Sequence, residues 1–169
     1  MAKILYEENL KYFIDCGKAQ WATNRIHDAY QDAHLQLKDV DFAIENAECI
    51  LLVEYKNAKL KGARKKGEFD PESSEVMSSV VQKYFDSLHY LQLLGKQKPV
   101  RFIYILECPY GDSRMRKKLR NRMKAMLPFE LQKQMNTGKM LIDTFDIVSI
   151  DEWNQHHVYG QYPCRPMVV

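Results

Sequence analysis

Apolar positions along this chain form short continuous runs separated by stretches with helical periodicity. Residues 39–57 predict two adjacent strands, joined by a short connection at 46–48. The second strand contains the run 49–53, which is apolar on both faces and is typical of a buried strand. Residues 100–106 predict another buried strand, and a last strand is expected within 140–150.

Helical periodicity predicts the segments between these strands. The expected helices cover residues 6–15, 18–34, 70–94, 113–127 and 129–135. The longest has the clearest signals, because Asp70-Pro71-Glu72 is a typical helix start and Gly95 a typical end. Its predicted buried stripe consists of Val76, Val80, Tyr84, Leu88 and Leu91. The mixture of strands and helices predicts an α/β fold, followed by an irregular tail from Asp151.

Length and composition are those of one globular domain covering residues 1–169, with a formal net charge of only +3. The four cysteines have no C-x-x-C spacing, so we expect buried thiols in a reducing compartment. The first residues lack the apolar core of a signal peptide, and no apolar run is long enough for a membrane helix. These observations predict a cytoplasmic protein with no membrane partner.

Charged side chains gather where the two adjacent strands should meet. Side chains two positions apart on a strand share a face, so Glu54 and Lys56 should point the same way. If the strands pair through the short connection, Asp41 lies beside them. Two carboxylates and an ammonium group then converge, which predicts a site for a hard divalent cation such as Mg²⁺.

A solvated strand end is the alternative interpretation of these charges. An E-x-K triplet occurs by chance, and a charged strand end is usually a solvated one. The position favours a functional site, because charges that emerge directly from a buried strand need partners or a metal.

Cations dominate two further segments, the loop at 58–67 and the helix at 113–127. Each is typical of a solvated surface, but few acids accompany them and both suit a phosphate backbone. The expected nucleic-acid contacts are Lys59, Lys61, Arg64, Lys65, Lys66, Gln82, Arg114, Arg116, Lys117 and Arg120. Gln82 is included because it could reach a bound phosphate or Lys56 from the helix that follows the loop.

The order helix, strand with Asp, strand with E-x-K, helix, strand resembles the PD-(D/E)xK nuclease superfamily. That superfamily includes restriction endonucleases, archaeal Holliday-junction resolvases and repair exonucleases. Val40-Asp41-Phe42 matches its first motif and Glu54-Tyr55-Lys56 its second, 13 positions later. The resemblance covers a core at about 18–106, and residues 107–169 are an elaboration. Val40 replaces the usual proline, and the strand that usually comes first has only a weak counterpart at 34–38.

The resemblance implies a restriction-endonuclease-like fold, with a mixed central sheet of four to five strands flanked by helices. It implies an endo- or exonuclease that acts on DNA in preference to RNA. Asp41 and Glu54 would bind Mg²⁺ (or Mn²⁺) with help from the Tyr55 carbonyl, and Lys56 would position the attacking water. Some relatives add an acid near the N-terminus, a role open to Glu7, Glu8 or Asp28.

Two other functions remain open at this stage. A module with the same fold but without catalysis would bind nucleic acid or an acidic protein through its basic segments. Alternatively, the methionine-rich helix at 113–127 and the aromatic tail would form a subunit contact, as in a homodimer. Motifs for nucleotide-binding loops, serine hydrolases and zinc proteases do not occur in the sequence.

Overall fold

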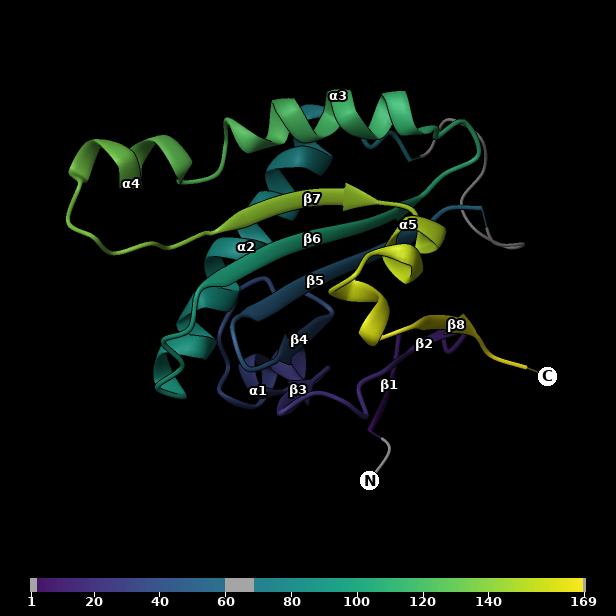
Figure 1. Ribbon diagram of the computed structural model, residues 1–169, viewed down its shortest axis with the longest axis horizontal. Helices are drawn as coiled ribbons and strands as arrows, with labels where there is room; N and C mark the ends of the chain where they lie inside the picture. The colour runs from purple at the N-terminus through teal and green to yellow at the C-terminus, as the bar shows by residue number, and fades with distance from the viewer. Residues whose placement is uncertain (1–2, 60–68, 169) are drawn as a thin grey trace.

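The computed structural model describes residues 3–59 and 69–168, which are organised around a five-stranded sheet (Figure 1). Its strands, in spatial order, are β3 (Trp21–Thr23), β4 (Phe42–Glu45), β5 (Ile50–Asn57), β6 (Val100–Glu107) and β7 (Thr144–Val148). The pairs β3–β4 and β4–β5 are antiparallel, whereas β5–β6 and β6–β7 are parallel. The predicted α/β class with a mixed sheet of four to five strands is therefore confirmed.

A second, antiparallel sheet replaces the helix predicted at 6–15. It consists of β1 (Ile4–Tyr6), β2 (Tyr12–Asp15) and β8 (Cys164–Pro166), in the order β1-β2-β8. The helix prediction was wrong because the turn between β1 and β2 has its own stabilising group. The Glu7 carboxylate accepts backbone hydrogen bonds from Asn9, Lys11 and Tyr12, and Leu10 has a φ of +56° that a helix cannot accommodate.

The helices follow the predictions most closely where the signals are strongest. They are α1 (Ile26–Asp32), α2 (Ser74–Leu93), α3 (Ser113–Lys124), α4 (Phe129–Met135), α5 (Ile150–Gln155) and the 3₁₀ turn η1 (Tyr159–Gln161). The helix predicted at 18–34 was wrong in its first half, where the chain forms the edge strand β3. The weak strand candidate at 34–38 was also wrong, because residues 34–38 form a turn and an extended connection, and His34 has a φ of +59°. The tail was not irregular as predicted, because it forms α5, η1 and β8.

The start of α2 differs from the prediction by one turn. Its N-cap is Ser73, whose hydroxyl accepts a hydrogen bond from the Val76 amide at 3.2 Å, and Asp70 precedes the helix. Gly95 follows the helix with a φ of +71°, as expected for a C-terminal glycine. In α3 the cap is Asp112, which accepts from the Met115 amide at 2.8 Å.

Two hydrophobic layers cover the two faces of the main sheet. Helices α1, α2 and α3 pack on one face, while the small sheet, α5 and η1 pack on the other (Figure 1). Side chains of β5 alternate between these layers, with Ile50 and Leu52 facing the helices and Leu51 and Val53 the small sheet. This alternation continues beyond the apolar run and directs Glu54 towards α2.

The predicted stripe of α2 is buried at Val80, Tyr84 and Leu91, and half-buried at Val76 and Leu88. All four cysteines are buried free thiols, as predicted. Within residues 3–59 and 69–168, the helices are too short or too polar to cross a bilayer.

Candidate metal and phosphate site

The register between β4 and β5 brings the two predicted acids together. Phe42 pairs with Val53 and Ala43 with Leu52, so extending the register by one position sets Asp41 opposite Glu54. Asp41 lies immediately before β4, and its Oδ2 accepts a hydrogen bond of 2.8 Å from the Tyr55 amide. The side chain thereby anchors its own segment to the end of β5.

Asp41 and Glu54 both line a small cavity of about 140 Å³. It is lined by Glu7, Glu8, Asn9, Asp41, Glu54, Tyr55, Lys56, Asn57 and Lys83. The structure therefore places all three residues of the predicted core, Asp41, Glu54 and Lys56, on one cavity.

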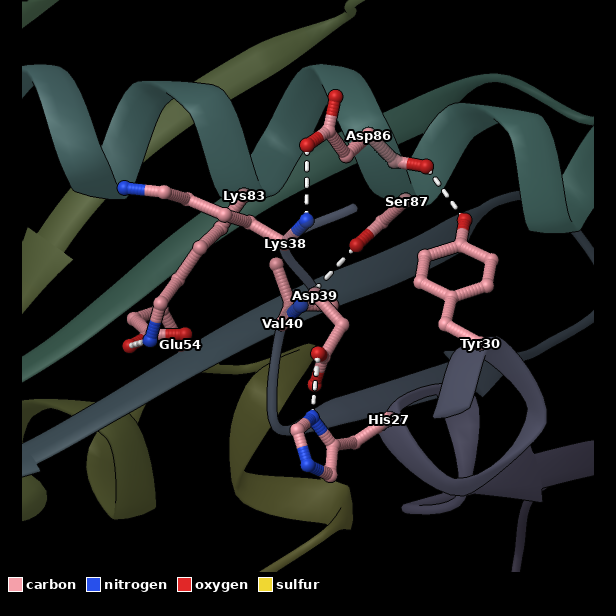
Figure 2. Close-up of polar contacts among 9 residues, drawn as sticks. All are labelled: His27, Tyr30, Lys38, Asp39, Val40, Glu54, Lys83, Asp86 and Ser87. Carbon is pink, nitrogen blue, oxygen red and sulfur yellow. Dashed lines mark hydrogen bonds and ion pairs between the residues drawn. The ribbon is translucent and has the colours of Figure 1, made fainter. Parts of the chain in front are cut away.

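Glu54 has an unusual environment for a carboxylate, since only 5% of the residue is exposed. Its Oε1 is 2.5 Å from Nζ of Lys83, which reaches down from α2 (Figure 2). Its Oε2 is buried and has no hydrogen-bond partner in the part of the chain that the structure describes. A buried carboxylate oxygen without a partner is energetically costly and marks a position where a cation would be stabilised.

The pKa values of Asp41 and Glu54 also favour a bound cation. Burial raises the pKa of Asp41 to about 6, although Lys83 and the Tyr55 amide oppose the increase. Burial, and then repulsion by Asp41, raise the pKa of Glu54 to about 8 against the opposing effect of Lys83. The charge of the half-buried Asp41 disfavours ionisation of the buried Glu54, and both acids would ionise more readily beside a divalent cation.

The donor set fits such an ion in part. Among the described residues no group of three or more His, Cys, Asp or Glu side chains is arranged around one point. Mg²⁺, however, commonly takes one or two protein carboxylates and fills its other positions with water and phosphate oxygens. Asp41 and Glu54 meet this requirement, because both offer hard oxygen ligands and one Glu54 oxygen has no hydrogen-bond partner within residues 3–59 and 69–168.

Comparisons with protein-family models, curated proteins and solved structures find no match to this chain.

Helix α2 fixes the segment that carries Asp41 (Figure 2). Asp86 Oδ2 accepts from the Lys38 amide at 2.8 Å, and Ser87 Oγ accepts from the Val40 amide at 3.0 Å. Tyr30 of α1 donates its hydroxyl hydrogen to the Asp86 carbonyl at 2.5 Å. One helix thus positions both acids, Asp41 through backbone contacts and Glu54 through Lys83.

A larger cavity of about 740 Å³ adjoins the small one and shares four of its lining residues. The shared residues are Glu7, Glu8, Asp41 and Lys83. Among its other residues, His27 places Nδ1 2.9 Å from Oδ1 of Asp39. This hydrogen bond raises the pKa of His27.

The three N-terminal acids differ in what they offer the site. The Glu7 carboxylate is engaged by the backbone of the β1–β2 turn. Asp28 lines only the larger cavity and pairs with Arg25 at 3.1 Å. Glu8 is exposed and lines both cavities, which makes it the best placed of the three to act as an additional acid.

The remaining predicted residues of this region have varied positions. Lys56 has its Nζ 5.0 Å from the centroid of the Phe69 ring. Lys59 pairs with Glu107 at 2.9 Å, and Gln82 donates to Asp86 within α2. Lys61, Arg64, Lys65 and Lys66 lie outside the described residues.

The basic helix α3 is partly neutralised by acids of neighbouring elements. Arg116 forms an ion pair with Glu152, and Arg120 lies 3.8 Å from Asp146. Arg114 and Lys117 are exposed. On this helix, the predicted nucleic-acid contacts that remain exposed are therefore mainly Arg114 and Lys117.

Lys83 and the pair His27–Asp39 are features that sequence reasoning missed. A signal for Lys83 did exist, because it lies three positions after Val80 and four before Ser87, both of which face the sheet side of α2. A lysine with that spacing borders the buried stripe and can reach a charge at a strand end.

Proposed function

We propose that this chain is a metal-dependent nuclease with a restriction-endonuclease-like fold, hydrolysing phosphodiester bonds of DNA. The observation that carries the proposal is the buried Oε2 of Glu54, which has no hydrogen-bond partner among the residues that the structure describes and belongs to the same small cavity as Asp41. The spacing of Asp41, Glu54 and Lys56 supports it, as does the mixed sheet. Magnesium or manganese is the cofactor that suits these oxygens.

The residues of the chain would divide the work as follows. Asp41 would present Oδ1, since Oδ2 holds the Tyr55 amide, and Glu54 would present Oε2. The Tyr55 carbonyl would be a further oxygen ligand, since Tyr55 lines the same cavity. When bound, the ion supplies a water of lowered pKa and offsets negative charge on the phosphorus centre. Lys56, also on the cavity, would orient the attacking water.

The test is cleavage of plasmid DNA, single-stranded DNA and RNA with Mg²⁺, with Mn²⁺ and with chelator. We expect metal-dependent cleavage that falls about 100-fold or more in Asp41→Ala and Glu54→Ala. Glu48→Ala is the matched control, because this acid is exposed in the β4–β5 turn, and it should retain wild-type cleavage.

Direct titration with Mn²⁺ complements the cleavage assay and should show binding that Asp41→Ala removes. Cleavage that persists in chelator, or that is unchanged in both variants, would contradict the proposal. Salt-sensitive DNA binding without any cleavage would instead favour a non-catalytic binding module.

A further inference from the structure

Lys83 holds a position at the junction of the two cavities. It extends from α2 towards β5, and Figure 2 shows its ammonium group directed at Glu54. It lines the small cavity with both acids and also the larger cavity that opens beside them. A ligand that reaches the acids from the larger cavity would therefore pass Lys83.

The second lysine of the small cavity has a different contact. The Lys56 ammonium lies over the Phe69 ring, whereas the Lys83 ammonium contacts Glu54. The side chain of Lys83 is 29% exposed, so its charge is partly desolvated and acts strongly on its neighbours. Of these two lysines, the one supplied by the helix is already in contact with Glu54.

The bonding capacity of Lys83 leaves room for a substrate. An ammonium group has three donors, and its contact with Glu54 Oε1 uses one of them.

We propose that Lys83 supplies the ammonium group that binds the scissile phosphate, in addition to Lys56, which the E-x-K motif provides for the attacking water. This inference rests on the proposed function. Lys83 would hold Oε1 of Glu54, so that Oε2 stays directed at the cation, and would donate a second N–H to a non-bridging oxygen of the scissile phosphate. Its phosphate contact makes it a catalytic residue, and its contact with Glu54 makes it a positioning residue as well.

The reaction step leaves Lys83 protonated throughout. The water oxygen forms a bond to phosphorus while the bond from phosphorus to the leaving oxygen breaks. The attacking water releases its proton to solvent, and the leaving oxygen takes a proton from solvent. Lys83 stabilises the charge on the non-bridging oxygens, a preorganised electrostatic effect that grows in the transition state.

The test compares Lys83→Met with the matched variant Lys96→Met, whose ammonium group forms a comparable ion pair with Glu45 outside both cavities, and Lys56→Met is assayed alongside. We expect Lys83→Met to lower kcat by about 100-fold, in the range found for single preorganised donors, and Lys96→Met to change it by less than about fivefold. Two binding measurements accompany the assay. Mn²⁺ affinity should stay within about tenfold of wild type in Lys83→Met, whereas inorganic phosphate binding in the presence of Mn²⁺ should weaken by about tenfold or more.

Chemical rescue separates catalysis from structural support. Methylammonium should restore part of the activity of Lys83→Ala and should not affect Asp41→Ala, because a small cation can replace the missing ammonium group only in the former. If Lys83→Met does not fold, Lys83→Gln and Lys83→Arg provide the same comparison with smaller changes in packing.

The outcomes distinguish this inference from the proposed function. Wild-type cleavage with an unimpaired Lys83→Met, or a loss confined to Lys56→Met, would overturn the role of Lys83 alone. Unchanged phosphate binding in Lys83→Met would overturn its contact with the substrate. Absence of both cleavage and Mn²⁺ binding in the wild-type protein would overturn both proposals.

Discussion

At the scale of single residues, Glu54 combines deep burial with an incomplete set of partners. Lys83 satisfies one oxygen and leaves the other without a hydrogen bond among the described residues. Such an arrangement lowers the stability of the folded chain, and residues that break the rules of packing in this way are concentrated at functional sites.

Stability should therefore depend on pH through Glu54. Its pKa is raised in the folded state, to about 8, so folding favours the protonated form. The resulting stabilisation is present below the unfolded pKa and is lost as pH rises through the folded pKa. Glu54→Gln keeps an acceptor for Lys83 but cannot ionise, so its stability relative to wild type should increase by on the order of 2 kcal/mol between pH 5 and pH 8.

Urea denaturation of both proteins at the two pH values, without metal, measures this difference. Glu48→Gln serves as the control, since an exposed acid should give no comparable change. A difference that stays constant or decreases with pH would show that Glu54 is ionised without strain.

The sequence was sufficient to predict that Asp41 and Glu54 lie side by side, because Asp41 comes immediately before β4, Glu54 belongs to β5, and the two strands pair through a short connection. It was not sufficient for Lys83, whose contact spans 29 positions and depends on how α2 packs over β5. A strand face is local information, whereas the partner that a helix supplies to it is a property of tertiary packing.

At the scale of elements, α2 fixes the position of the segment that carries Asp41. Ser87 is fully buried and its hydroxyl holds the Val40 amide, one residue before Asp41. Ser79 lies two turns earlier on the same helix. Among the described residues, its hydroxyl accepts a hydrogen bond from the exposed Lys38 ammonium group and from no backbone amide. The two serines therefore form a matched pair for substitution.

Ser87→Ala should lower the free energy of unfolding by about 1–2 kcal/mol, because it leaves a buried backbone amide without an acceptor. It should also weaken Mn²⁺ binding, since the segment of Asp41 is no longer fixed. Ser79→Ala should change neither quantity measurably. Chemical denaturation and metal titration test this prediction. Equal effects of the two substitutions would contradict the role of Ser87 in fixing the segment of Asp41.

Element prediction succeeded for α2, β5 and β6, whose length and caps or continuous apolar runs are local signals. It failed at 6–15, where Tyr6, Leu10 and Phe13 have helical spacing but the chain forms a hairpin. There the side chain of Glu7 and the pairing with β8 outweigh the periodicity, and the pairing with residues 164–166 is not visible in a local window.

At the scale of the whole molecule, the small sheet and α5 form a second layer that supports the site from the opposite face. Trp153 is its central residue, with no exposed surface. The ring stacks on Tyr159 at a centroid distance of 5.1 Å, and its Nε1 donates to the Tyr162 carbonyl at 2.7 Å. Cys16 and Cys164 are buried in the same layer.

Trp153→Ala should reduce the free energy of unfolding by about 3–5 kcal/mol, as expected for removal of a large buried aromatic residue. The thiols of Cys16 and Cys164 should react faster with a disulfide reagent, because their layer is loosened. Trp21→Ala, at a half-buried position on the edge strand, should cost less and leave these thiols protected. Similar results for both variants would contradict a central role for Trp153.

The hydrogen bond from the Tyr55 amide to Asp41 has a practical consequence. An amide proton that donates to a carboxylate changes its chemical shift when that carboxylate gains or loses a proton or a ligand. In a two-dimensional NMR spectrum of uniformly labelled protein, one cross-peak would thus report the chemical state of Asp41. Titration of this signal could be followed without introducing any probe into the site.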